Sequence, residues 1–369
     1  MKQSHRLNNV GLINRDKVIT FNFNGKSYQG YEGDTLASAL LANGVHLVGR
    51  SFKYHRPRGF IGAGVDEPNA KLQVTINGHS EPNINATEIE LVDGLSATSQ
   101  NCWPSVEFDI GAINNFLKRF FPAGFYYKTF MWPKSFWFKV YEPFIRKAAG
   151  LGVASLEKDK ERYEHKFEYC DLLVTGSGPS GLASAYAAAK NGAKVILAED
   201  KPRYGGTLLT DDVSIDNMSG KDWSEKIISE LKTMPNVTLK NRSQVFGYYD
   251  HNMMVMFERV GDHLSNKSKY TPRQRLWYIR AKETILSTGS IERPIVFGNN
   301  DTPGVVLSSA AKEYMKVYGV LVGRKPIIFT NNDSAYETAF EFKKNNVEPI
   351  ILDTREEHDS EVVREAKNK

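Results

Sequence analysis

Hydrophobic and polar positions alternate strictly near the start of the chain. Between residues 17 and 32, Ile19, Phe21 and Phe23 alternate with polar residues, and Asn24-Gly25 divides the block. Alternation on both sides of an Asn-Gly pair is typical of two antiparallel strands joined by a tight turn. The sequence therefore predicts a β-hairpin at residues 17–32.

After the hairpin the apolar spacing changes to pairs four positions apart. Such pairs run from Leu36 to Leu41, with Asp34-Thr35 before them and Asn43-Gly44 after them. This pattern predicts a short helix that is capped at both ends. A further strand is expected at residues 72–76, closed by Asn77-Gly78.

The loop between this helix and this strand decides whether the domain can bind an iron–sulfur cluster. Hairpin, helix and strand in this order resemble the β-grasp frame of plant-type ferredoxins, whose loop after the helix holds the cluster cysteines. Here that loop, Arg50 to Asn69, contains no cysteine, so we expect the frame without the cluster. Its basic and aromatic part, residues 51–59, suits either a packed surface loop or contact with a phosphate or a partner. His55 is no metal site, because no second His or Cys lies at ligand spacing.

Residues 116–144 contain thirteen aromatic side chains, interrupted by lysine and arginine. The aromatic residues include Phe125, Tyr126, Tyr127, Trp132, Trp137 and Tyr141. Pro122, Pro133 and Pro143 break any long helix, so a membrane span is not favoured. Bases could stack on such aromatic rings, but nucleic-acid binding is not favoured either. A buried linker or a subunit interface remains, because aromatic anchors are common at large interfaces. Residues 148–152 and the charged run 157–166 are expected to be an exposed linker.

A glycine-rich loop follows a short apolar strand at residues 171–175. It reads Gly176-Ser177-Gly178-Pro179-Ser180-Gly181. A helix is expected over residues 182–190, and a second strand over 194–198 leads to Glu199-Asp200. In this context the first glycine permits a tight turn, the second lets the backbone approach a pyrophosphate, and the third allows close helix–strand packing. Together with the free N–H groups of the helix, this predicts a Rossmann dinucleotide site.

The acid after the second strand indicates which dinucleotide fits. Glu199 stands where a carboxylate accepts hydrogen bonds from an adenosine ribose. This favours NAD or FAD over NADP, whose 2′-phosphate would be repelled, although Lys201 and Arg203 weaken that preference. Gly205-Gly206-Thr207 suits a second approach to the pyrophosphate, with an ordinary flexible loop as the alternative.

The rest of the chain predicts more strands and a second nucleotide-type fold. Residues 237–257 and 275–287 are expected to be β-rich, and the latter strand leads into Thr288-Gly289, an order that resembles flavoprotein disulfide reductases. Strand, helix and strand then recur at residues 325–330, 335–344 and 350–352. The loop 331–334 has no glycine, so we expect this second site to be lost. The chain ends at Lys369 before the unit is complete, and we expect a truncated sequence.

Charge and cysteine content narrow the classes of partner. The net charge is +5, from 48 basic and 43 acidic residues, without a block of like charges, so no nucleic-acid partner is expected. The two cysteines, Cys102 and Cys170, form no C-x-x-C pair, which argues against a redox dithiol, a zinc ribbon or a cluster. Without a signal peptide or a long apolar stretch, a cytoplasmic protein with no membrane span is predicted.

The expected fold class is α/β. We predict a cluster-free β-grasp domain at residues 1–110 and an aromatic linker or interface segment at 111–166. A Rossmann domain of the type with two dinucleotide-binding units follows at 167–369, and its incomplete second unit begins at about residue 324.

Six stretches together resemble the alpha subunits of heterotetrameric sarcosine oxidases. They are FKYHRPRG at 52–59, EPNA at 67–70, QNCWPS at 100–105, AGFYYKTFMWP at 123–133, the glycine-rich loop, and ERPIVFGNNDTPG at 292–304. The resemblance implies an NAD-binding subunit that assembles with beta, gamma and delta subunits. The complex would convert sarcosine to glycine, hydrogen peroxide and a one-carbon unit passed to tetrahydrofolate, using FAD on the beta subunit and FMN near the alpha–beta boundary.

The loop analysis and the resemblance together give the cofactor contacts expected in this chain. They are Gly176, Gly178, Pro179, Ser180, Gly181, Glu199, Asp200, Lys201, Gly205, Gly206, Thr207, Val245, Thr288 and Gly289. No catalytic residue and no metal ligand is assigned, so the amine chemistry is expected elsewhere in the complex. The alternatives are an FAD-binding subunit of a related amine, proline or opine dehydrogenase, a free-standing pyridine-nucleotide reductase, and a non-catalytic scaffold that holds its nucleotide structurally.

Overall fold

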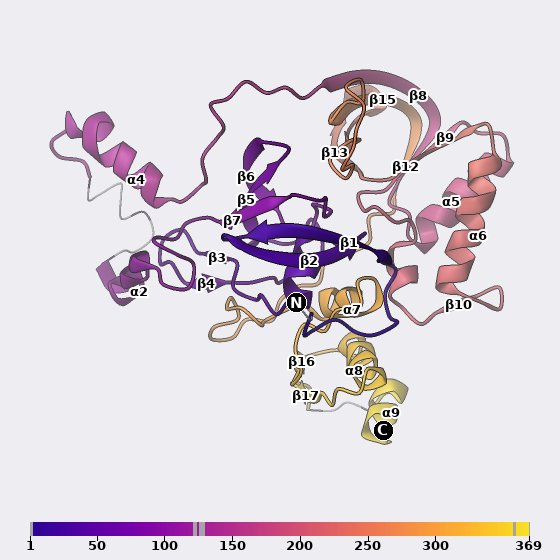
Figure 1. Cartoon of the computed structure of the whole chain (residues 1–369). Coiled ribbons are helices and arrows are strands. Elements are labelled where there is room, and N and C mark those ends of the chain that lie inside the picture. Colours follow the sequence, from indigo (N-terminus) through magenta and orange to yellow (C-terminus); the bar gives the residue numbers. More distant parts are fainter. Residues whose placement is uncertain (1–2, 121–123, 125–129, 357–358, 369) are drawn as a thin grey trace. The chain divides into compact units, whose positions relative to one another are not determined.

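The computed structural model describes residues 3–120, 124, 130–356 and 359–368. The chain forms two compact units. One comprises Met1–Lys158 and Arg293–Lys369, and the other comprises Asp159–Glu292. Figure 1 traces their helices and strands in the order of the sequence. The second unit is thus inserted into the first along the chain, and each is described by itself below.

A five-stranded mixed sheet forms the centre of the first unit. Its order is β2-β1-β7-β5-β6, in which β1 and β7 are parallel and the other neighbours antiparallel. The strands are β1 (Asn14–Phe23), β2 (Lys26–Glu32), β5 (Lys71–Ile76), β6 (His79–Asn85) and β7 (Ser96–Ser99). The predicted hairpin is confirmed, with Asn24 and Gly25 at φ of 49° and 76° as its two-residue turn requires.

Helix α1 (Leu36–Ala42) is buried along its whole length. Its first turn is closed by a capping box, in which the Thr35 hydroxyl accepts from the Ser38 N–H at 3.1 Å and the Ser38 hydroxyl accepts from the Thr35 N–H at 3.0 Å. The predicted helix and its cap are therefore confirmed. The neighbouring Asp34 is fully buried and forms an ion pair with Arg6 at 2.6 Å.

The loop after α1 is held by ion pairs. It contains the short antiparallel strands β3 (Gly49–Arg50) and β4 (Pro57–Arg58). Arg56 and Arg58 both bind the carboxylate of Asp301, and His55 Nδ1 lies 2.7 Å from the buried Asp109. These contacts favour the packed surface loop over the alternative of contact with a phosphate or a partner, because the basic side chains already bind acids of this chain.

Short helical elements make up the described part of the aromatic segment. They are η1 (Ile110–Ala112), α2 (Ile113–Phe116), η2 (Lys118–Phe120), η3 (Trp137–Tyr141) and α4 (Glu142–Ala148). Phe116, Trp132 and Phe138 are exposed, which argues against a linker that is buried within the first unit. The predictions for Pro122 and for Phe125, Tyr126 and Tyr127 lie outside the described residues.

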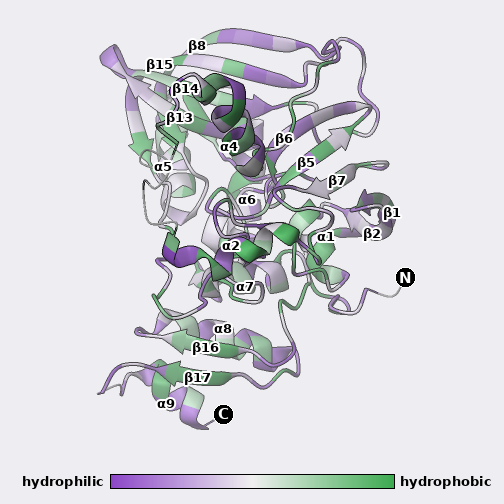
Figure 2. Ribbon diagram, turned by 90° about the vertical axis from the view of Figure 1, so that its left-hand side faces the viewer, coloured by the Kyte–Doolittle hydropathy of each residue, from purple (hydrophilic) through white to green (hydrophobic). Residues whose placement is uncertain are grey.

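Residues 293–369 complete the first unit. Their elements are α7 (Ser308–Lys316), β16 (Ile327–Thr330), α8 (Ser334–Lys344), β17 (Ile350–Asp353) and α9 (Glu361–Asn368). The strand–helix–strand pattern predicted here is confirmed, with β16 and β17 parallel. Both strands carry the colour of hydrophobic residues in Figure 2, as is typical of parallel strands. Helix α7 is anchored by the buried Tyr314, whose hydroxyl donates to the carbonyl of Gly62 at 2.9 Å.

The second unit is built on a six-stranded sheet of order β12-β9-β8-β15-β14-β13. Its strands are β8 (Tyr163–Thr175), β9 (Val195–Ala198), β12 (Val237–Lys240), β13 (Ser243–Tyr249), β14 (Met253–Arg259) and β15 (Gln274–Leu286). Helices α5 (Pro179–Lys190) and α6 (Gly220–Thr233) pack on β8 and β9 through a shared core that includes Leu182, Leu197 and Ile227. The predicted β-rich segments are confirmed, whereas α6 was not predicted.

The start of β8 corrects the predicted linker. Residues 163–166 were expected to be exposed linker, but they are the first residues of β8 and pair in parallel with Gln274–Trp277 of β15. Arg275 also forms an ion pair with Glu164 at 2.9 Å. The charged residues belong to a strand because β15 supplies backbone partners, which the local sequence could not reveal.

Candidate functional site

The glycine-rich loop connects β8 to α5 and is shaped by close backbone contacts. Gly176 has φ of 96°, and a Cβ atom there would lie 2.2 Å from the carbonyl oxygen of Ser287. A Cβ atom at Gly181 would lie 1.9 Å from the Gly176 oxygen. Both positions therefore exclude every larger residue, which agrees with the roles predicted for a tight turn and for close helix packing.

Gly178 differs from these two glycines, because an added Cβ atom would meet no atom within 4 Å. It is the N-cap of α5, and Pro179 is the first helical residue. Pro179 and Ser180 are exposed. The loop thus leaves open space in front of a helix N-terminus, where backbone N–H groups attract a phosphate.

Gly205 and Gly206 lie against this loop. The Gly205 N–H donates to the Ser177 carbonyl at 3.2 Å and to the Ser177 hydroxyl at 3.1 Å. A Cβ atom at Gly206 would lie 2.9 Å from the Cα of Gly178. The glycine pair therefore packs against the glycine-rich loop, which supports the predicted second approach to a pyrophosphate over an ordinary flexible loop. Thr207 is exposed at the start of η4 (Gly206–Leu209).

Glu199 follows β9 and is buried within the site. Its Oε2 accepts from the Ser177 N–H at 2.9 Å and from the Ser177 hydroxyl at 2.6 Å, and its Oε1 accepts from the Lys201 N–H at 3.0 Å. Burial, assisted by the neighbouring Asp200, raises the pKa of Glu199 to about 7. Ser177 and the half-buried Tyr204, whose pKa is raised by desolvation and by the Glu199 charge, were missed by the sequence analysis.

Two further segments complete this edge of the sheet. The Ser243 N–H donates to the Glu199 carbonyl at 2.7 Å, and Val245 packs against the core cluster that contains Ala198. At the end of β15, the Ser287 N–H donates to the Thr175 carbonyl at 2.8 Å, and exposed Thr288 and Gly289 follow. The predicted contacts from distant parts of the chain thus gather where β8, β9 and β15 end.

These features fit a dinucleotide. The space at Gly178 and the helix N-terminus suit a pyrophosphate, while Glu199 and Asp200 suit an adenosine ribose. The second nucleotide-type unit is different, because the guanidinium of Arg355 and the hydroxyl of Tyr336 already occupy the carboxylate of Asp353, at 2.7 and 2.9 Å. This occupation supports the prediction that the second site is lost.

Two known protein families match this chain, one in the β-grasp region and one in the Rossmann region. Residues 16–102 match the family of 2Fe-2S iron-sulfur cluster binding domains, and residues 171–254 match the family of FAD dependent oxidoreductases. The first match does not extend to its cluster. Residues 16–102 contain one cysteine, Cys102, and the described residues include no group of three or more His, Cys, Asp and Glu that could hold a metal. A 2Fe-2S cluster needs four ligands, so these residues do not fit it.

Curated relatives match nearly the whole chain. The chain is 51% identical over 353 residues to the sarcosine oxidase subunit alpha of Rhizobium meliloti (strain 1021), an alignment that covers 95% of this chain and 36% of the relative. The chain is homologous to sarcosine oxidase alpha subunits. The relative from Corynebacterium sp. (strain U-96) is 33% identical, over 93% of this chain and 31% of its own length. The resemblance inferred from the sequence is therefore confirmed, and the chain spans about a third of the relatives it matches.

A solved structure supports the fold. L-proline dehydrogenase from P. horikoshii aligns with 97% of this chain and 57% of its own, at a TM-score of 0.63 and 21% identity. Among the described residues, no helix is long and apolar enough to cross a membrane. The mixed α/β class is thus confirmed for a homologue of oxidoreductase subunits.

Proposed function

We propose that this chain is the NAD-binding part of an alpha subunit in a multi-subunit sarcosine oxidase. The observation that carries the proposal is the 51% identity to such a subunit over 95% of the chain. The open space at Gly178 in front of α5 supports a bound dinucleotide. The complex converts sarcosine, tetrahydrofolate and oxygen to glycine, methylenetetrahydrofolate and hydrogen peroxide, with FAD on the beta subunit and FMN near the alpha–beta boundary.

Within this division of labour the chain binds and orients a nucleotide. The backbone of Gly178 and the first turn of α5 face the pyrophosphate, and Gly206 packs against the backbone of Gly178. Glu199 and Asp200 accept the ribose hydroxyls, with Val245 beside the adenine. Bound NAD supplies a nicotinamide that can exchange a hydride. No residue of this chain is assigned to the oxidation of the amine.

The second candidate places FAD in the same site. It is favoured by the match of residues 171–254 to FAD dependent oxidoreductases and by the acidic ribose contact, which FAD and NAD share. In that case the chain carries a flavin itself, as a subunit related to amine, proline or opine dehydrogenases.

Identification of the bound nucleotide separates the two candidates. The purified chain is denatured with acid, and the released ligand is identified by absorbance and mass. One equivalent of NAD without flavin supports the first candidate, and one equivalent of FAD supports the second. A chain that binds neither added NAD nor added FAD would contradict both.

A further inference from the structure

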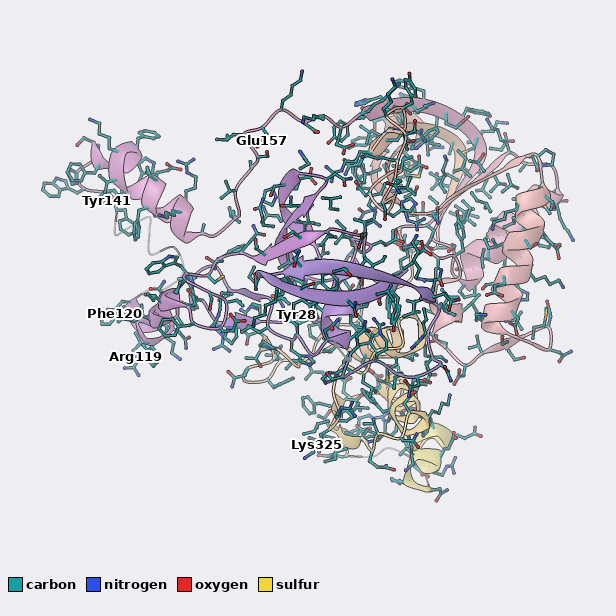
Figure 3. All side chains as sticks on the ribbon, viewed as in Figure 1. Tyr28, Arg119, Phe120, Tyr141, Glu157 and Lys325 are labelled. Atoms are coloured by element: carbon teal, nitrogen blue, oxygen red, sulfur yellow. The ribbon has the colours of Figure 1, made fainter. Side chains whose placement is uncertain are left out.

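A stretch of the first unit exposes many apolar side chains. We term its described residues, 103–120 and 130–156, the aromatic arm. The exposed fractions are 86% for Phe116, 76% for Phe120, 83% for Trp132, 82% for Phe138 and 70% for Phe144. Exposed apolar surface of this extent marks an interaction site or an aggregation liability. Figure 3 shows Arg119 and Phe120 on the short element η2, and Tyr141 at the junction of η3 and α4.

The same stretch concentrates the positive charge of the chain. Residues 116–148 contain seven lysines and arginines and one acid, Glu142, a balance of +6. The whole chain has +5, so the remainder is close to neutral. Lys118, Arg119 and Lys139 are exposed beside the aromatic residues. The partner surface that fits such a stretch is apolar at its centre and carries carboxylates around it.

We propose that the aromatic arm docks onto an acidic, apolar surface of another subunit of the complex. This inference rests on the proposed function, which supplies a multi-subunit assembly. Large aromatic side chains in pockets of the partner carry most of the energy of an interface, and surrounding charges steer association. The lysines and arginines of the arm would therefore set the rate of docking, and the rings its strength.

A second copy of the chain and a lipid surface are less suitable binding partners for the aromatic arm. A second copy would bring two stretches of +6 together, while the rest of each copy offers almost no net charge to balance them. A lipid surface binds best to one continuous amphipathic helix. Here the exposed rings come from separate short elements, η2 and α4 among them, of three and seven residues. Separate elements suit pockets in a folded partner.

Zero-length cross-linking of the assembled complex tests the docking directly. A carbodiimide joins a lysine amine to a carboxylate only where the two already touch. We expect Lys118, Lys134 or Lys139 to be joined to aspartates or glutamates of another polypeptide, identified by mass spectrometry. Cross-links from these lysines only to this chain or to a second copy of it would overturn the proposal.

Matched variants of the full chain test the energetics. F120A/F138A should weaken binding to the purified subunit identified by cross-linking at least about tenfold. K118E/R119E should also weaken this binding, and the binding should then depend less on the NaCl concentration. F167A and K226E are the controls, because Phe167 is 80% exposed and Lys226 is exposed in the second unit. They should bind as the unmodified chain does. Equal losses of subunit binding in arm and control variants would overturn the proposal. It would also be overturned if the unmodified chain bound vesicles of anionic phosphatidylglycerol and only the arm variants lost that binding.

Nucleotide content separates this inference from the proposed function. The arm variants should keep their nucleotide and their thermal unfolding midpoint, because the substituted side chains are exposed. Assembly through the arm without any bound nucleotide would contradict the proposed function alone. A nucleotide-loaded chain in an active complex whose arm variants assemble normally would overturn the docking alone.

Discussion

The carboxylate of Glu199 holds Ser177 by both its backbone N–H and its hydroxyl, at 2.9 and 2.6 Å. The two residues lie in different loops, one after β8 and one after β9. The acid that the sequence assigned to the ribose is therefore also the acceptor that fixes the glycine-rich loop. In the proposed site, a nucleotide would meet a carboxylate that is already oriented.

Replacing Glu199 with glutamine should weaken nucleotide binding. The amide keeps the size of the side chain but loses the charge that strengthens hydrogen bonds to the ribose hydroxyls. Hydrogen bonds to charged groups contribute about 1.5–3 kcal/mol, so the dissociation constant should rise by roughly 10- to 100-fold. Isothermal titration calorimetry with NAD and FAD measures this. Glu225→Gln, at an exposed position of α6, is the matched control and should bind normally.

Nucleotide binding should depend on pH through Glu199. Burial and Asp200 raise its pKa from 4.5 to about 7, so the folded chain holds this proton more tightly than the unfolded chain. The stability from this group is complete below pH 4.5 and is lost as the pH rises to about 7. Ribose hydroxyls donate to the ionised form, so affinity should fall as the pH decreases below 7.

Calorimetry at pH 6 in two buffers of different ionisation enthalpy checks this proton linkage. The chain should release protons when the nucleotide binds, and E199Q should release none. Equal proton release by both would assign the linkage to another group.

Alanine substitutions in the glycine-rich loop should separate binding from folding. At Gly178 an added methyl group meets no protein atom, so G178A should keep its thermal midpoint while losing most of its nucleotide affinity. At Gly181 the methyl group would lie 1.9 Å from the Gly176 oxygen, so G181A should unfold at a clearly lower temperature. Calorimetric scans and nucleotide titrations measure both. A G178A chain with normal affinity would show that no ligand approaches this backbone.

Iron and sulfide should not assemble a cluster on residues 16–102. Cys102 is the single cysteine there, and burial raises the pKa of its thiol, which opposes the thiolate form that iron binds. Anaerobic reconstitution with ferrous iron and sulfide, followed by absorbance and iron analysis, should give the same result for the chain and for Cys102→Ser. Stoichiometric iron that is lost in the Ser variant would contradict this.

Breaking the buried ion pair of the first unit should destabilise it. Arg6 and Asp34 lie 2.6 Å apart with 5% and 0% of their side chains exposed. Asp34→Ala leaves the Arg6 charge without its acid, and the loss should be about 3–5 kcal/mol, measured by urea denaturation. The double variant R6M/D34L should lose less, because no charge stays buried. The exposed pair of Lys17 and Glu32 provides the control, and K17A should change little.

Local patterns predicted several elements because their physics is local. The turn at Asn24-Gly25 needs two residues with positive φ, and the cap at Thr35 uses a partner three residues away. The loop around Gly178 combines a turn and a helix start within six residues. In each case the deciding contacts lie close in sequence, so alternation, spacing and residue type were enough.

Contacts between residues far apart in the sequence decided the parts of the fold that local patterns did not predict. The carboxylate of Asp301 holds Arg56, 245 residues away, and the carbonyl of Tyr318 accepts from Arg6, 312 residues away. These bonds join residues 293–369 to residues 1–158 within the first unit, an association that no local pattern indicates. The sequence by itself determined the glycine-rich loop, the acid that follows β9 and the lack of cluster cysteines, since each depends on residue type at fixed spacing. Only the tertiary structure decided that Ser177 binds Glu199, that Arg355 occupies Asp353, and that β8 extends to Tyr163, because each needs a partner brought in by folding.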